Sequence, residues 1–180
     1  MVNFTRAAAA LALAATATAA PTNGTTSLTW DVKDFEFKAE YQFTTPAHQN
    51  SYGHVNFSLT SEKTGAVYSC GAQSSQIPNF FYDFNDFYPC SAPKGPVEGT
   101  ESWASFKYNR EDGKVTIRET LYAPENKSIT ATGSTIVKTT CTDESTGPNP
   151  NWTLGGGEIY SDRKIVCDKV DFTVTGTVSA

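Results

Sequence analysis

The four cysteines of the chain are the residues whose type and spacing point most directly to chemistry. They are Cys70, Cys90, Cys141 and Cys167, with 19 residues between the first two and 25 between the last two. No two of them have the C-x2-4-C spacing of a zinc site, and an even number of cysteines behind a secretion signal predicts disulfide bonds. Four cysteines allow three pairings. Pairing in sequence order would close loops of about 21 and 27 residues, each worth roughly 3 kcal/mol.

Carboxylates are the second group of residues with catalytic potential. A glycoside hydrolase needs two acids that face each other across a sugar-binding cleft. The chain offers Glu98, Glu101, Glu119 and Glu158. The sequence does not show that any two of them meet, and it lacks the stretches that flank the catalytic acids of small xylanase-type β-sandwiches. We therefore predict no catalytic residues and no enzyme activity, with a glycoside hydrolase as the alternative.

The remaining candidates for catalysis or metal binding are weak. His48 and His54 are the only histidines, and no G-x-S-x-G nucleophile motif accompanies them. The stretch Asp83-Phe84-Asn85-Asp86 offers oxygen ligands for calcium but lacks the alternating acids and central glycine of an EF-hand loop. Gly155-Gly156-Gly157 is not followed by the Lys and Ser/Thr of a phosphate loop. We predict no metal and no cofactor.

An aromatic and acidic segment is the sharpest candidate for function. It runs from Phe80 to Tyr88 and holds six aromatic residues. Aromatic rings anchor protein interfaces and stack on sugars. We therefore predict a partner-binding surface that consists of Phe81, Tyr82, Asp83, Asp86 and Tyr88. The alternative is that some of these rings pack on the β-core while the acids face water.

Residues 1–19 have the features of a signal peptide. Arg6 precedes an apolar run over residues 7–15, and Ala17-Thr18-Ala19 gives the small-x-small cleavage pattern. We place the cleavage after Ala19, because a cut after Ala20 would leave a proline next to the scissile bond. The apolar run falls short of the length that spans a bilayer. We expect residues 20–180 to be a single domain that is secreted to the extracellular space.

Four sequons for N-glycosylation agree with secretion. Their asparagines are Asn23, Asn56, Asn126 and Asn151. Asn126 and Asn151 lie in turn-like stretches and are the preferred acceptors. Asn56 lies in a strand pattern, so it is an acceptor only if its face of the strand is open to solvent.

The charge of the chain argues against several classes of partner. It carries 14 Lys and Arg against 19 Asp and Glu, a formal net charge of −5. Without the signal peptide, which contains Arg6, the balance is 13 against 19, or −6. A mildly acidic chain without a Lys/Arg cluster indicates that neither nucleic acid nor an anionic membrane surface is a partner.

The elements that position these residues are predicted to be strands. Short runs of Val, Ile, Thr, Phe and Tyr alternate with Gly, Pro, Asn and Asp clusters, which is typical of an antiparallel β-barrel or sandwich. The alternation changes phase near Lys33-Asp34, which predicts a β-bulge. Residues 102–108 and 114–122 read as a hairpin around an Asp-Gly turn. Residues 73–96 and 142–157 are expected to be long loops.

At this level the chain resembles the family of small secreted fungal proteins typified by the major allergen of Alternaria. The resemblance rests on short motifs in order along the chain, on the 102–121 hairpin and on the late cysteine pair. The motifs are Trp30-x-Val32-x-x-Phe35, Val55-Asn56-Phe57-Ser58-Leu59, Cys70-Gly71-Ala72-Gln73 and Tyr88-Pro89-Cys90.

The resemblance implies a compact β-barrel in which Cys70 pairs with Cys90 and Cys141 with Cys167. It also implies a non-enzymatic role, since members resemble effectors or elicitors that meet host plant proteins, and some are allergens or bind small phenolic ligands. The extra N-terminal cysteine of the typifying allergen is missing, which indicates a monomer or a non-covalent oligomer. The loop before Cys167 is long, so no partner residues are carried over there.

These observations predict a secreted fungal non-enzymatic binding protein of the effector or elicitor type. Its expected partners are host plant extracellular proteins or small phenolic ligands. The alternative is a carbohydrate-binding or glycoside-hydrolase-like β-domain that acts on cell-wall glycans. A structural component of the cell wall is the third reading.

Overall fold

The computed structural model describes residues 27–83, 86–91, 101–123 and 127–179. The predicted signal peptide, Asn23, Glu98 and Asn126 lie outside these residues. Within them the chain forms ten strands and no helix, and therefore no helix that could cross a membrane. The all-β prediction is confirmed.

The strands alternate with short turns, as the sequence pattern predicts. They are β1 (Ser27–Thr45), β2 (His48–Ser61), β3 (Val67–Ser74), β4 (Tyr88–Pro89), β5 (Glu101–Asn109), β6 (Lys114–Ala123), β7 (Lys127–Ile136), β8 (Cys141–Thr146), β9 (Ser161–Cys167) and β10 (Val170–Ser179).

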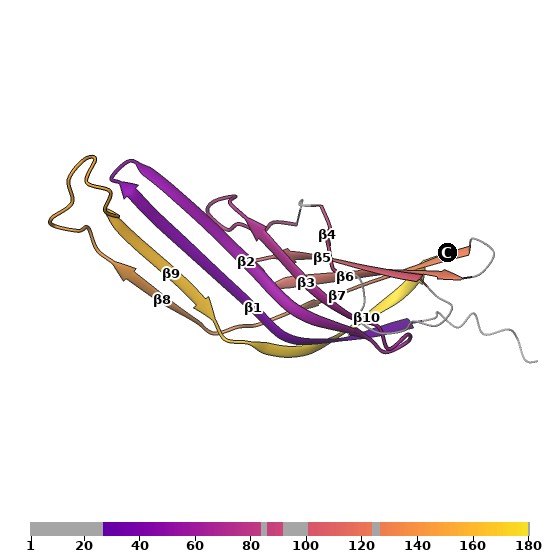
Figure 1. Cartoon of the computed structure of the whole chain (residues 1–180). Coiled ribbons are helices and arrows are strands. Elements are labelled where there is room, and N and C mark those ends of the chain that lie inside the picture. Colours follow the sequence, from indigo (N-terminus) through magenta and orange to yellow (C-terminus); the bar gives the residue numbers. More distant parts are fainter. Residues whose placement is uncertain (1–26, 84–85, 92–100, 124–126, 180) are drawn as a thin grey trace, which may run out of the picture.

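Eight of these strands form a nearly closed antiparallel barrel, in the order β3-β2-β1-β10-β7-β6-β5-β4 (Figure 1). The two ends of this order meet where Cys70 and Cys90 form both a β-bridge and a disulfide. Next to the disulfide, the Ser91 amide donates to the Ser69 carbonyl at 2.8 Å. The first disulfide therefore holds the seam of the barrel, and of the two predicted architectures the barrel is correct.

Strands β9 and β8 extend the sheet into an arm, which we define as residues 38–54 and 141–167. In the arm β1 pairs with β9, and β9 pairs with β8. Figure 1 shows it projecting from the barrel on the side away from the C-terminus. The second disulfide, Cys141–Cys167, joins β8 to β9 at a directly opposed pair. The expectation of a loop over residues 142–157 was wrong for 142–146, which pair with β9 as strand β8.

A β-bulge in β1 separates the barrel from the arm, as predicted near Lys33-Asp34. The register of β1 shifts between Val32 and Phe35 against β10, and Asp34 has a φ of 55°. The Asp34 amide donates to Asp171 Oδ1 at 2.9 Å. The bulge is thus fixed by β10, the strand that β1 leaves at this point.

The core consists of the inward residues of each strand and is rich in aromatic rings. The rings of Phe57 and Phe106 lie 4.8 Å apart between centroids, and those of Phe35 and Tyr108 lie 5.3 Å apart. Edge-to-face and tilted pairs of this kind add to the free energy of simple burial. The two contacts link β1 and β2 to β5 across the barrel.

Phe80 and Phe81 belong to this core, although they come from the predicted loop. Both are fully buried. The Phe80 ring lies against Gly53 so closely that a Cβ at that position would come within 2.6 Å of it. The Phe81 ring lies 5.7 Å from both Tyr88 and Tyr108. The loop after β3 therefore fills the barrel where the arm begins.

One charged residue, Glu119 of β6, is also fully buried. Its carboxylate accepts hydrogen bonds from Trp30 Nε1 at 2.6 Å, Ser61 Oγ at 2.8 Å and the Tyr68 hydroxyl at 3.0 Å. The Tyr68 oxygen is also hydrogen-bonded to Ser102 Oγ, and there the Ser102 hydroxyl donates, because the single Tyr68 proton goes to Glu119. A buried carboxylate is stable only when its oxygens are hydrogen-bonded in this way. Glu119 thereby connects β1, β2, β3 and β6 inside the barrel.

We predict that this network is a major source of stability. Glu119→Ala should lower the free energy of unfolding by roughly 3–5 kcal/mol, because three buried donors lose their acceptor. Glu119→Gln should cost less, about 1–3 kcal/mol, because one oxygen remains. Urea unfolding measures both, with the exposed Glu144→Ala as the matched control. A Glu119→Ala protein as stable as the control would contradict the assignment.

Removal of the first disulfide should destabilise the barrel, whereas removal of the second should loosen only the arm. Replacing Cys70 and Cys90 by serine removes the link at the seam and should lower the free energy of unfolding by roughly 3 kcal/mol. Replacing Cys141 and Cys167 by serine frees β8, whose one partner strand in the described part of the chain is β9. Hydrogen exchange should then rise in β8 while the barrel stays protected. Equal exchange of the barrel in both variants would contradict this distinction.

Candidate functional site

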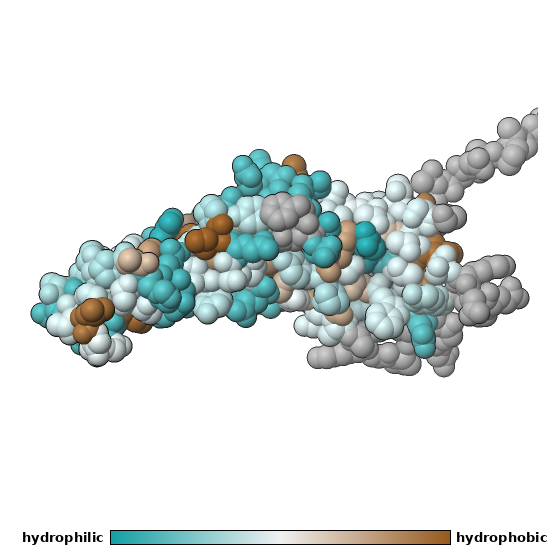
Figure 2. All heavy atoms as spheres, turned by 90° about the horizontal axis from the view of Figure 1, so that it is seen from above, coloured by the Kyte–Doolittle hydropathy of each residue, from teal (hydrophilic) through white to brown (hydrophobic). Residues whose placement is uncertain are grey.

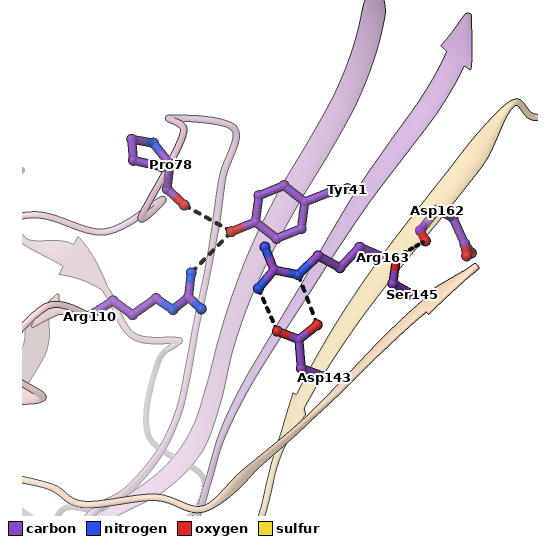
Figure 3. A network of polar contacts seen from close by, with 7 residues as sticks. All are labelled: Tyr41, Pro78, Arg110, Asp143, Ser145, Asp162 and Arg163. Atoms are coloured by element: carbon purple, nitrogen blue, oxygen red, sulfur yellow. Dashed lines mark hydrogen bonds and ion pairs between the residues drawn. The ribbon is translucent and has the colours of Figure 1, made fainter. Parts of the chain in front are cut away.

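A network of polar contacts joins the arm to the barrel (Figure 3). The hydroxyl of Tyr41 in β1 donates to the Pro78 carbonyl at 2.9 Å and accepts from Arg110 Nη1 at 3.2 Å. Arg163 of β9 lies over the Tyr41 ring, with its guanidinium carbon 5.4 Å from the ring centroid. The same guanidinium forms two hydrogen bonds with the Asp143 carboxylate of β8. Tyr41 is therefore held at its hydroxyl by one arginine and at its face by another.

Arg110 reaches this network from the turn between β5 and β6. The turn is fixed by its own side chains, since Asn109 Oδ1 accepts from the Glu111 amide at 2.9 Å and Gly113 adopts a φ of 73°. The Arg110 amide donates to the Phe81 carbonyl at 3.3 Å. Its guanidinium carbon lies 4.6 Å from the centroid of Phe37. Such cation–π contact holds the side chain in place without neutralising its charge.

A cleft of about 460 Å³ lies beside Arg110, and we call it the junction cleft. Phe37 and Tyr108 form part of its wall, Lys138 adds a second cation, and the Cys141–Cys167 disulfide borders it. Among the described residues, neither Arg110 nor Lys138 takes part in an ion pair. A volume of this size falls within the range of small-molecule sites. Glu111 and Asp112 also line the cleft, so its two cations are balanced by two acids. Aromatic walls with charged groups of both signs suit an aromatic ligand that carries polar groups.

Two ionisable groups near the cleft have pKa values that their surroundings shift. Burial raises the pKa of Tyr108 to about 12, and the nearby Arg110 charge opposes this only in part. The hydrogen bond with Arg163 lowers the pKa of Asp143. Tyr108 is therefore a neutral wall of the cleft at physiological pH, while Asp143 is ionised and engaged with Arg163.

We predict a loss of stability at alkaline pH. In the unfolded chain Tyr108 deprotonates near pH 10, whereas in the folded protein it keeps its proton up to about pH 12. The folded state thus binds more protons in this window, so the free energy of unfolding falls as the pH rises. The loss from Tyr108 should approach about 3 kcal/mol. Burial also raises the pKa of Tyr68, which acts in the same direction.

Urea unfolding at pH 9 and pH 11.5 measures this loss. Tyr108→Phe removes the titrating hydroxyl and keeps the ring, so its stability should vary less with pH than that of the unmodified protein. An identical pH dependence in the two proteins would contradict the assignment to Tyr108.

The free end of the arm carries a second candidate contact surface. The loop after β8 is held there by Trp152, whose Nε1 donates to the carbonyls of Thr44 and Glu158, both at 3.1 Å. Leu154 next to it is 84% exposed, and Ile159 is also exposed. Figure 2 shows a mostly hydrophilic face with separate apolar patches, one of them near the end of the arm.

Only some of the residues of the predicted partner surface are exposed. Phe81 is fully buried, and this part of the prediction was wrong, because the ring completes the aromatic core. Tyr88 also packs inward, 5.6 Å from Phe106, and Tyr82 is half-buried. Asp83 and Asp86 are exposed, and Asp83 Oδ2 lies 3.8 Å from Lys114 Nζ. Among the described residues of this segment, Phe80 and Phe81 are thus buried, whereas both acids are exposed.

The candidate catalytic acids are not brought together among the described residues. Glu119 points into the barrel and is enclosed by its donors. Glu101 is exposed on β5, and Glu158 accepts from Asn149 Nδ2 at 3.0 Å in the arm. No two of these three carboxylates share a cleft.

The two histidine side chains lie far apart. His48 and His54 are six residues apart in the same strand, which corresponds to about 20 Å. Within the described residues no group of three or more His, Cys, Asp or Glu side chains could hold a metal ion. Phe84 and Asn85 of the proposed calcium stretch lie outside the described residues.

Of the sequons within the described residues, Asn56 and Asn151 both have exposed asparagines. Asn56 lies on the outward face of β2, and the absence of a side chain on the opposed Gly71 leaves it space. The condition set for Asn56, an open face, is therefore met. Its glycosylation and that of Asn151 stay predictions.

The residues of the junction cleft and of the polar network beside it escaped the sequence analysis. Arg110 and Lys138 line the cleft, Arg163 belongs to the network, and each of the three lies on a different element. A signal was present in Phe37 and Tyr41, which continue the alternation of β1 beyond the residues that pair with β10. The convergence of these five residues depends on the bulge and on β9, which no local pattern specifies.

The fold and the two disulfides define this chain as a disulfide-bonded antiparallel β-barrel protein with a projecting arm. The family model of Alternaria alternata allergen 1 matches residues 32–167. The chain belongs to this family and is thus an allergen-like protein. Both disulfides and the family agree with a secreted protein. Comparison with the curated proteins gives no match, and neither does comparison with the solved structures.

Proposed function

We propose that this chain is a secreted fungal binding protein of the effector or elicitor type, which recognises an extracellular protein of a host plant. The junction cleft is the main support for this proposal. In it Arg110 and Lys138, which form no ion pair among the described residues, lie next to the rings of Phe37 and Tyr108. The acids Glu111 and Asp112 line the same cleft. An aromatic side chain of a partner, with a polar group within reach of Arg110 or Lys138, fits this chemistry, and so does a small phenolic acid.

The construction of the arm adds to this argument. Its root is held by Tyr41, Arg110 and Arg163, and its end by Trp152. A contact surface that is already fixed before binding loses less conformational freedom on association. The exposed Leu154 then offers an apolar contact at the end of the arm.

Capture from plant apoplastic fluid tests the proposal. The unmodified protein should retain a specific host protein on a column. Lys138→Ala and Arg110→Gln should each weaken this capture about ten-fold or more, because each removes one of the two cations that line the cleft. Gln at position 110 keeps most of the aliphatic stem that packs on Phe37.

Lys63→Ala is the matched control, since Lys63 is an exposed lysine in the turn after β2. It should capture as well as the unmodified protein. Capture of no specific plant protein by the unmodified chain, or equal loss in the control, would contradict the proposal. Titration with ferulic acid, followed by fluorescence, examines the small-ligand form of the same site.

Action without catalysis is part of the proposal. Glu119, one of the four candidate acids, is committed to the core by its three donors. Incubation with plant and fungal cell-wall glycans should therefore release no reducing sugars. Release that disappears on mutation of Glu101 or Glu158 would favour the glycoside-hydrolase alternative.

A further inference from the structure

The outer face of β5, β6 and β7 has a composition that the junction cleft does not explain. Three rows of directly opposed residues cross these strands. The rows are Glu101–Tyr122–Ser128, Trp103–Thr120–Thr130 and Ser105–Arg118–Thr132. We call these nine residues the outer grid. All of them point away from the core, since their neighbours Ser102, Ala104, Ile117, Glu119 and Ala131 are buried.

Two aromatic side chains dominate the outer grid. Trp103 is 68% exposed and Tyr122 is 43% exposed. Trp103 is paired with Thr120 of β6, and Tyr122 is paired with Glu101 on one side and with Ser128 on the other. Among the described residues the Trp103 indole N–H and the Tyr122 hydroxyl make no hydrogen bond. As diagonal neighbours on adjacent strands, they lie about 7–8 Å apart at their Cα atoms. Their faces are thus close enough to contact one ligand together.

The polar members of the outer grid are held in place. Thr120 Oγ1 and Thr130 Oγ1 share a hydrogen bond of 3.1 Å. The guanidinium carbon of Arg118 lies 3.6 Å from the ring centroid of Phe87, which fixes its position beside Ser105. Arg118 and Glu101 carry opposite charges on the same face, so the grid has little net charge.

We propose that the outer grid binds an uncharged β-1,4-linked glycan chain. Sugar rings with this linkage present flat C–H faces that stack on exposed indole and phenol rings. Their hydroxyl groups find donors and acceptors in Ser105, Thr120 and Arg118. A protein hot spot would place its aromatic anchors in an apolar, desolvated surrounding, whereas here hydroxyl and charged groups surround the rings. This site lies apart from the junction cleft, so its test is independent of the test of the proposed function.

Titration of the whole protein with cellohexaose and chitohexaose tests this site. Binding should change the tryptophan fluorescence, because Trp103 is exposed whereas Trp30 is fully buried and Trp152 is packed in the arm. Trp103→Ala should weaken binding at least about ten-fold, and Tyr122→Ala about three-fold or more. Both variants should unfold at nearly the same temperature as the unmodified protein, since they remove exposed rings.

Tyr52→Ala is the matched control, because Tyr52 is 43% exposed, as is Tyr122, but lies on the arm. Its affinity should stay within about two-fold of that of the unmodified protein. Polygalacturonate should bind more weakly than the neutral oligosaccharides. The proposal is overturned if neither oligosaccharide binds, if Trp103→Ala binds as well as Tyr52→Ala, or if Trp103→Ala loses only capture of a plant protein.

Discussion

The β-bulge at Asp34 is the constraint on which the rest of the structure depends. Before it β1 pairs with β10, and after it β1 pairs with β9. The two partner strands are separated only by residues 168–169, so the change of partner takes place at the bulge itself. Asp171 and Lys169 both contact Asp34 there. Strand β1 therefore belongs to the barrel before the bulge and to the arm after it.

The bulge also determines which side chains meet at the junction. Because side chains alternate along a strand, one extra residue moves every later position to the other face. Phe37 and Tyr41 consequently share a face that turns toward Arg110 and the loop after β3. Without the shift, those rings would lie on the opposite face. The junction cleft is thus a consequence of backbone register as much as of the residues that line it.

The sequence predicted the parts of this structure that depend on local pattern. Alternation revealed the bulge and the 102–122 hairpin, and the cysteine count with the family resemblance led to the correct pairing. Burial across the barrel was less predictable. Phe81 and Asp83 are two residues apart in an aromatic, acidic segment, yet one is fully buried and the other exposed. Which ring fills the barrel depends on Gly53 and Phe37, and both come from distant strands.

The burial of Glu119 was also not predictable from the sequence, because its partners come from distant strands. In sequence it is one carboxylate in an alternating strand, at a position where an apolar residue is expected. Only the fold brings Trp30, Ser61 and Tyr68 around it, from residues 51 to 89 positions away. A catalytic candidate in the sequence is therefore a structural residue in the protein. Segment 142–146 escaped prediction for a similar reason, since its polar residues form a strand only by pairing with β9.

The two faces of the β5–β6 hairpin connect this buried network to the surface. Inward, Ser102 and Glu119 bind to Tyr68, and Glu119 also to Trp30. Outward, Trp103 and Thr120 are their immediate neighbours and are directly opposed to each other. A backbone held from inside by buried hydrogen bonds keeps the outer side chains at fixed spacing. The inner network therefore gives the outer grid the rigidity that a recognition surface requires.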